Sequence, residues 1–288
     1  MEFVTPPATH FDSYDADDDP FAGHCFRRLA DVYGGAAKSY APMERLLLAE
    51  EEPPTFAEAA SYESWRSAML EELASIKENG TWTLIDLPAG HTTIGLKWVF
   101  KLKNDAAGAV VKHKARLIAR GFVQKEGVDY DDAFALVARL DSVRFMVGTA
   151  AQHGWELHHL DVKSAFLNGE LKEEVYVTQP PGFARRGEDH KVFLLHKALY
   201  GLWQTPRAWN TKLECTMHQF GFASCPLEHA MYVRGEGQAW LLVGVYVDDL
   251  IVSGADAEAI RSFKREMMAR FRMSDLGLLS FYLGIEVK

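Results

Sequence analysis

Hydrophobic residues recur at helical spacing in four segments of the chain. The first segment presents apolar side chains on one face, at Trp65, Met69, Leu73 and Ile76. It should begin near residue 62 and end at the Asn79-Gly80 pair, because glycine readily adopts the backbone conformation that follows a helix. The other predicted helices cover residues 142–153, 207–220 and 257–271. Ser142 is the expected N-cap of the second helix, because its hydroxyl can accept a hydrogen bond from an early backbone N–H.

Short apolar runs between these helices predict β-strands. The expected strands cover residues 81–87, 97–103, 110–119, 156–162 and 241–247. Residues 104–108 suit a hairpin turn between the second and third strands. The strand 241–247 is apolar throughout, as a strand buried on both faces would be. Because strands and helices share the chain without strict alternation, the pattern predicts the α+β class.

Acidic residues are concentrated at the start of the chain. Residues 1–60 carry 12 Asp and Glu but 4 Lys and Arg, and they include the runs Asp-Ala-Asp-Asp-Asp-Pro and Glu-Glu-Glu-Pro-Pro. We expect an acidic, disordered leader over residues 1–60 and one folded domain over residues 61–288. Outside the leader, 28 acidic and 27 basic residues nearly balance. The net charge of −9 therefore does not exclude a nucleic-acid partner.

Several function classes have no support in the sequence. The three cysteines, Cys25, Cys215 and Cys225, lack zinc-ligand spacing and are too few for a disulfide framework. No segment approaches about 18 consecutive apolar residues, and no signal peptide is recognisable, so an intracellular protein without a membrane partner is expected. His158 and His159 have no acid or cysteine at metal-ligand spacing on the same face, and we expect packing and turn roles for them.

Three aspartates are the candidate chemical groups. Asp248 and Asp249 lie between two apolar runs, a pattern that predicts a β-hairpin with a two-residue acidic turn. Aspartate also favours turns without any chemistry. Adjacent carboxylates beside a buried sheet repel each other, however, unless a cation compensates them. Asp161 ends another apolar strand, and together with Asp248 it could supply the hard oxygen ligands that Mg²⁺ prefers.

A basic segment precedes these aspartates. Residues 95–125 contain eight Lys and Arg but one acid, with aromatic residues interleaved. Alternate residues of a strand share a face, so Lys112, Lys114 and Arg116 are expected to point the same way. The segment is either a solvated hairpin face or a surface for phosphates and nucleic acid.

A series of motifs resembles one family. In order, the chain contains GLKWVFK at 95–101, KHKARLIARGF at 112–122, HHLDVKSAFLNG at 158–169, QPPGF at 179–183, KALYGL at 197–202, PRAW at 206–209 and YVDD at 246–249. This series resembles the reverse transcriptase of copia-type long-terminal-repeat retrotransposons, especially plant copies. The resemblance runs from about residue 62 to the last residue.

The resemblance implies a polymerase with fingers and palm, in which an antiparallel palm sheet packs on helices. The implied reaction is the attack of a primer 3′-oxygen on the α-phosphorus of a deoxynucleoside triphosphate, with two Mg²⁺ ions for which Mn²⁺ can substitute. The implied partners are an RNA or DNA template with its primer, inside cytoplasmic virus-like particles. Residues 281–287 resemble the hairpin that grips the primer. Because the chain stops directly afterwards, we expect no thumb and only weak, distributive polymerisation.

The resemblance also assigns roles to individual residues. Asp161, Val162 and Asp248 would hold the metal ions, with Asp249 in support. Lys114 and Arg116, then Arg120, would contact phosphates. Residues expected along the nucleotide are Val162, Lys163, Ser164, Ala165, Phe166, Tyr200 and Gly201, and those expected at the primer are Leu283 and Gly284. Phe166 matches the side chain that obstructs a ribose 2′-hydroxyl, although an aromatic residue after a strand is also typical of a core.

Some positions depart from the family pattern. Trp203 and Thr205 occupy positions where arginine and alanine are usual, Leu136 replaces a proline, and Ser274 lies where many relatives have lysine. Such changes keep a second hypothesis open, that of a noncatalytic remnant that folds and binds nucleic acid without useful turnover. A different two-metal nuclease would share the carboxylates but would not explain the basic segment or Phe166.

Overall fold

The computed structural model describes residues 52–287 except 106, 134, 136–137 and 236–239. All of these residues belong to the unit Glu51–Lys288. In chain order its elements are α2 (Phe56–Ala59), α3 (Glu63–Glu78), β1 (Trp82–Ile85), β2 (Leu96–Asn104), β3 (Val110–Ala119), η2 (Gly121–Val123), α4 (Leu140–His153), β4 (Leu157–Val162), η3 (Ala165–Asn168), β5 (Glu170–Val177), β6 (Val192–Lys197), α5 (Thr205–Gln219), β7 (Ala223–Cys225), β8 (Glu228–Arg234), β9 (Leu241–Tyr246), β10 (Asp249–Gly254), α6 (Ala257–Arg270), β11 (Met273–Leu278), β12 (Phe281–Tyr282) and β13 (Ile285–Glu286). The combination of antiparallel sheets with helices confirms the predicted α+β class.

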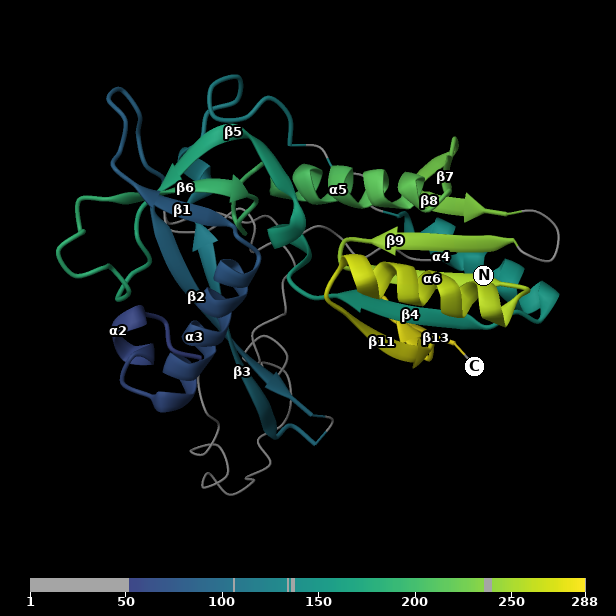
Figure 1. Cartoon of the computed structure of the whole chain (residues 1–288). Helices are drawn as coiled ribbons and strands as arrows, with labels where there is room; N and C mark the ends of the chain where they lie inside the picture. Colours follow the sequence, from purple (N-terminus) through teal and green to yellow (C-terminus); the bar gives the residue numbers. More distant parts are fainter. Residues whose placement is uncertain (1–51, 106, 134, 136–137, 236–239, 288) are drawn as a thin grey trace, which may run out of the picture. The chain divides into compact units, whose positions relative to one another are not determined.

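A six-stranded antiparallel sheet carries the predicted carboxylates. Its strand order is β11-β4-β10-β9-β8-β7, so β4 and β10 are neighbours although nearly ninety residues separate them in the chain. Helices α5 and α6 pack on one face of this sheet and α4 packs on the other (Figure 1). Helices on both faces explain why the central strand β9 is apolar throughout.

The side chains of β9 and β10 alternate between two hydrophobic cores. Val243 and Val252 pack with α5 and α6, whereas Leu242 and Ile251 pack with α4. Successive strand residues point to opposite faces, so a continuous apolar run is needed wherever both faces are covered. The predicted strand 241–247 is confirmed, and it ends one residue earlier, at Tyr246.

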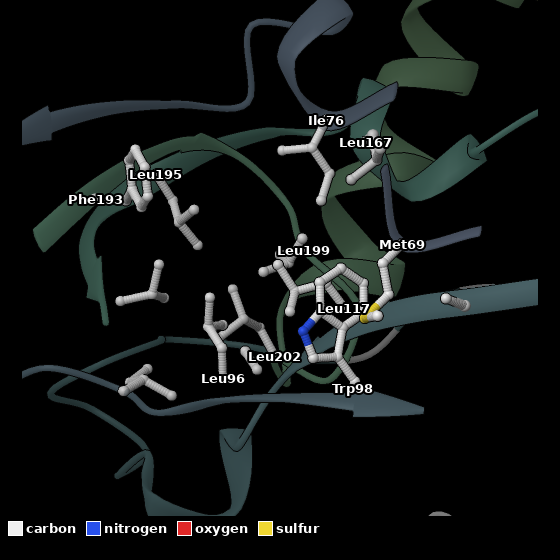
Figure 2. Close-up of a cluster of buried hydrophobic side chains, with 14 of the residues drawn as sticks. Met69, Ile76, Leu96, Trp98, Leu117, Leu167, Phe193, Leu195, Leu199 and Leu202 are labelled. Atoms are coloured by element: carbon white, nitrogen blue, oxygen red, sulfur yellow. The ribbon is translucent and has the colours of Figure 1, made fainter. Parts of the chain in front are cut away.

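The basic segment lies in a second group of strands and helices with a core of its own. Strands β2 and β3 form an antiparallel hairpin, and β1, β6 and β5 form a three-stranded sheet. Helix α3 packs on β3, and its apolar face enters a core shared with both groups of strands (Figure 2). Met69, Leu117 and Leu195 show this sharing, because they come from α3, β3 and β6.

The structure corrects two predicted boundaries. Folded structure begins before residue 61, because α2 is a helix capped by the Thr55 side chain and its Ala59 is fully buried. Residues 1–51 of the predicted leader, like Leu136, lie outside the described residues. Helix α4 begins at Leu140 rather than at residue 142. Ser142 is not its N-cap, because Arg139 holds that position and Ser142 lies inside the helix, where its hydroxyl donates a hydrogen bond to Glu228 at 2.6 Å.

Candidate active site

Strand pairing brings the three aspartates together at one edge of the six-stranded sheet. Asp161 near the end of β4 lies opposite Asp249, the first residue of β10. The backbone carbonyl of Asp248 accepts a hydrogen bond from the Val162 N–H at 2.8 Å, which ties the turn before β10 to β4. The sequence-predicted carboxylates therefore share one site.

The turn that carries Asp248 is displaced by one residue from the prediction. Tyr246 pairs with Asp249, so the two turn residues are Val247 and Asp248, and Asp249 belongs to the strand. Val247 has a φ of 57°, an unfavourable conformation for a β-branched residue. The indole N–H of Trp209 on α5 donates a hydrogen bond to the Val247 carbonyl at 2.7 Å and holds this strained turn against the helix.

Negative charge is concentrated around the Asp248 carboxyl. Burial raises the pKa of the Asp248 carboxyl, and the neighbouring charges of Asp249 and Asp161 raise it further, while Lys114 opposes the rise. Asp161 forms an ion pair with Lys163, and Asp249 Oδ1 lies 2.7 Å from His159 Nε2. The prediction of only packing and turn roles for His159 is therefore wrong. The histidine pairs with a site carboxylate, and this contact depends on strand register rather than on sequence spacing.

The donor set has the chemistry of a site for a hard divalent cation. Asp161 and Asp248 carry carboxylate oxygens, which are the ligands that Mg²⁺ prefers. A cation would also relieve the repulsion that raises the Asp248 pKa. Among the described residues, no three or more His, Cys, Asp or Glu side chains are grouped so that they could hold a metal ion. The residues fit the ion by their chemistry, and the side chains of Asp161 and Asp249 engage Lys163 and His159 instead.

A basic cleft of about 630 Å³ involves β3, α3 and the turn after β4. Side chains around it include Ser75, Lys114, Arg116, Lys163, Ser164 and Arg272. Burial lowers the pKa of the Lys114 ammonium, and the nearby Arg116 and Lys103 charges lower it further. Concentrated positive charge of this kind favours binding of phosphate groups. Arg120 follows the end of β3 and is not among the cleft-lining residues, so the structure does not bring it to the other phosphate candidates.

Aromatic rings connect this cleft to the segment after β6. The Arg116 guanidinium lies over the Tyr200 ring at 5.1 Å, and the Tyr200 and Phe166 rings are 5.0 Å apart. Gly201 follows with a φ of 91°, and a Cβ there would lie 2.2 Å from the Ala119 carbonyl oxygen. Only glycine therefore permits this approach of the segment to the end of β3.

The turn after β4 has mixed exposure. Val162 and Ala165 are buried in the core, with 1% and 3% of their surfaces exposed. Ser164 adopts a left-handed conformation with a φ of 50°, and its hydroxyl lies 3.2 Å from that of Ser75 on α3. Phe166 also packs at the edge of the α5–α6 core. Its aromatic ring thus contacts Tyr200 on the cleft side and the apolar core on the other.

The expected primer segment is a small hairpin next to the site. Leu283 and Gly284 form the turn between β12 and β13, both with positive φ, as a two-residue hairpin turn requires. Tyr282 is buried and its ring meets His159 edge to face at 5.5 Å. The hairpin therefore contacts the histidine that pairs with Asp249.

The structure describes the surroundings of three departures from the family pattern. The Trp203 ring stacks on Tyr130 at 6.2 Å, and the Thr205 hydroxyl donates a hydrogen bond to the Leu199 carbonyl at the start of α5. Ser274 on β11 lies opposite Asp161 in the strand register.

Sequence reasoning missed Glu72 and Trp209 as site residues. Glu72 forms a 2.8 Å ion pair with Arg116, and its spacing from Met69 and Ile76 places a carboxylate on the apolar face of α3. A charged residue at a position that helical periodicity assigns to the buried face could have identified Glu72 from the sequence. Trp209 gave no such signal, because a tryptophan on the buried face of a helix is ordinary core.

Comparison with known proteins finds one family over most of the chain. The sequence profile of the reverse transcriptase (RNA-dependent DNA polymerase) family matches residues 79–288. The chain is 38% identical over 243 residues to the retrovirus-related Pol polyprotein from transposon RE1 of Arabidopsis thaliana, covering 84% of this chain and 17% of that protein. It is 37% identical over 256 residues to the corresponding polyprotein from transposon TNT 1-94 of Nicotiana tabacum, covering 87% and 19%.

A shorter match extends to yeast. The chain is 35% identical over 128 residues to a putative transposon Ty5-1 protein of Saccharomyces cerevisiae, covering 44% of this chain and 42% of that protein. The chain thus spans less than a fifth of the length of the two plant polyproteins. None of the helices that the structure describes is long and apolar enough to pass through a bilayer. On the profile match and the plant relatives, this chain belongs to the reverse transcriptase (RNA-dependent DNA polymerase) family.

Proposed function

We propose that this chain catalyses RNA-directed DNA synthesis, adding a deoxynucleotide from its triphosphate to a primer 3′-hydroxyl. The observation that carries the proposal is the register between β4 and β10, which puts Asp161 opposite Asp249 and ties the Asp248 turn to the same edge. The six-stranded sheet would be the palm, and the β2–β3 hairpin with its neighbours would be the fingers.

The acidic residues of the site would bind metal ions, and the basic residues would bind the triphosphate. Asp161, Asp248 and the Val162 carbonyl would hold two Mg²⁺ ions, with Asp249 in support. When bound, such ions activate the attacking oxygen and stabilise the leaving oxygen. Lys114 and Arg116 would bind the triphosphate, because they carry positive charge into the cleft close to Asp248.

Other residues would position the two substrates. Backbone and side-chain groups of Lys163, Ser164 and Ala165 would lie along the triphosphate. The Phe166 ring would obstruct a ribose 2′-hydroxyl, with Tyr200 and Gly201 beneath the nucleotide. Leu283 and Gly284 would contact the primer strand, since their hairpin adjoins His159 and the carboxylate edge.

The plant relatives are named as Pol polyproteins from transposons. We propose that the chain acts as the reverse transcriptase part of such a retrotransposon polyprotein. Its template would be RNA or DNA paired to a primer. Its setting would be the cytoplasmic virus-like particle in which related elements copy themselves.

Primer extension tests the proposal directly. The chain should extend oligo(dT) on poly(rA) with dTTP and Mg²⁺, and Asp248→Asn should abolish extension. Asp141→Asn is the matched control, because the Asp141 side chain is 88% exposed on α4 and should not affect turnover. No extension by the wild type, together with salt-sensitive RNA binding, would instead support a noncatalytic nucleic-acid-binding remnant.

Metal binding can be measured separately from turnover. Mg²⁺ or Mn²⁺ should raise the melting temperature of the wild-type chain, because a ligand that binds only the folded state stabilises it. Asp161→Asn should remove that rise. An equal rise in the variant would show that the ions bind elsewhere.

A further inference from the structure

Helix α3 contributes a buried acid to the basic cleft. Glu72 Oε2 lies 2.8 Å from Arg116 Nη1, and the two side chains are 3% and 24% exposed. The helix covers Glu63–Glu78, so it precedes residues 79–288 that match the family profile. The profile match therefore does not include this acid, whereas the longer matches to the plant polyproteins extend across it.

Joining α3 to β3 through the Glu72–Arg116 ion pair requires both charged groups to lose water, which costs free energy. Burial raises the pKa of the Glu72 carboxyl, and the Arg116 charge opposes that rise. Among the described residues, Glu72 Oε1 is a buried oxygen without a hydrogen-bond partner. A buried ion pair often adds no more stability than apolar side chains of similar size would. A charge retained under these conditions is a candidate for a functional role.

The neighbouring acid on the same helix behaves differently. Glu71 forms an ion pair of the same length, 2.8 Å, with Lys112, but these side chains are 66% and 54% exposed. Exposed pairs contribute little and exchange freely with solvent. Glu72 is thus the acid on this helix turn that restrains its partner.

The Arg116 guanidinium, which lines the basic cleft, is contacted from two sides. Glu72 engages one edge of the Arg116 guanidinium, whose central carbon lies over the Tyr200 ring, 5.1 Å from the ring centroid. A guanidinium has five N–H donors in a rigid plane, so one carboxylate leaves donors for phosphate oxygens. Fixing the plane in advance lowers the entropy lost when a ligand binds.

We propose that Glu72 is a positioning residue that holds the Arg116 guanidinium against Tyr200, oriented to bind the phosphates of an incoming nucleotide. The proposal rests on the proposed polymerase function and deepens it. Glu72 acts through Arg116 and does not itself touch the nucleotide. Its removal should therefore weaken nucleotide binding more than it slows the chemical step.

Steady-state kinetics and direct binding test this role in the full 288-residue chain. Glu72→Gln should raise the KM for dTTP in poly(rA)/oligo(dT) extension by about tenfold with a much smaller change in kcat, which is the loss expected from one charge-assisted hydrogen bond. The Kd for Mg²⁺-dTTP, measured by calorimetry, should rise by a similar factor. Glu71→Gln makes the same charge change one residue away and should leave both values near those of the wild type.

A double-variant cycle separates positioning from general structural support. Arg116→Ala should also weaken dTTP binding, and adding Glu72→Gln to it should cause no further loss. Losses that multiply, or a Glu72→Gln chain that binds dTTP as tightly as Glu71→Gln, would overturn the proposal. If Glu72→Gln lowers the melting temperature too far for assay, Glu72→Asp replaces it. The smaller loss of dTTP affinity caused by Glu72→Asp must likewise be absent when Arg116 is already alanine.

The binding measurement keeps this proposal distinct from the polymerase proposal. A wild-type chain that extends no primer but loses dTTP affinity on Glu72→Gln would refute polymerisation and retain the positioning role. Normal extension with an unchanged KM in Glu72→Gln would refute the positioning role alone. A wild-type chain that binds no Mg²⁺-dTTP would refute both.

Discussion

Replacing Trp209 with phenylalanine should disturb the turn that carries Asp248. Trp209 is 2% exposed, and its ring packs edge to face against Phe271 at 5.3 Å. Phenylalanine preserves most of that apolar contact but removes the N–H that reaches the Val247 carbonyl. The change therefore isolates the hydrogen bond more cleanly than truncation to alanine would.

The expected loss of stability follows from two contributions. A partly buried carbonyl that loses its donor costs about 1–3 kcal/mol. The smaller ring leaves a void that adds about 1 kcal/mol. Together they should lower the free energy of unfolding by about 2–4 kcal/mol and the melting temperature by about 5–15 °C for a folded unit of this size.

Differential scanning calorimetry and primer extension would measure the two consequences of Trp209→Phe. The strained turn should relax once its carbonyl is released, so kcat should fall by about tenfold or more if Asp248 is catalytic. Trp155→Phe is the matched control, since Trp155 packs on His153 and Trp240 away from the turn. A Trp209→Phe melting temperature within about 1 °C of the wild type would refute the anchoring role.

Two further predictions concern a glycine and a buried histidine. Gly201→Ala should destabilise the chain more than Gly90→Ala, as thermal melts would show, because both have positive φ but only a Cβ at Gly201 meets a backbone oxygen, at 2.2 Å. Equal losses would argue against the close approach to β3. Burial and then the Lys264 charge lower the pKa of the His158 ring below 6.5, so the unfolded chain binds the proton more readily and stability should fall as pH drops below that value. His158→Gln should reduce this fall in melts between pH 7.5 and pH 5.5, whereas identical pH profiles would contradict it.

Much of the secondary structure could be predicted because it depends on local periodicity. Strand β3 has the predicted bounds, and the glycine C-cap at Gly154 follows the predicted end of α4. The errors occur where distant contacts compete with local preference. Ser142 would cap a helix in isolation, but Glu228 on β8 takes its hydroxyl. Ala59 is buried against residues far along the chain, which no local pattern around it indicates.

The sequence predicted the aspartates of the candidate site but not the side chains that pair with the site residues. Aspartates between apolar runs are visible in the sequence, because a charge at a strand end has a recognisable pattern. The pairing of Asp249 with His159 requires the alignment of β10 with β4. The restraint on Arg116 requires α3 to pack on β3.

The sequence by itself determined the α+β class, most helices and strands, and the three aspartates, because periodicity and motifs act over a few residues. Tertiary structure decided the strand register that unites Asp161 with Asp249, the one-residue shift of the Asp248 turn, and the burial of Glu72. Each of these depends on residues far apart in the chain that meet only when the sheets and helices pack. The physical reason is that register and burial are properties of pairs of elements, whereas helical and strand preference belongs to each segment alone.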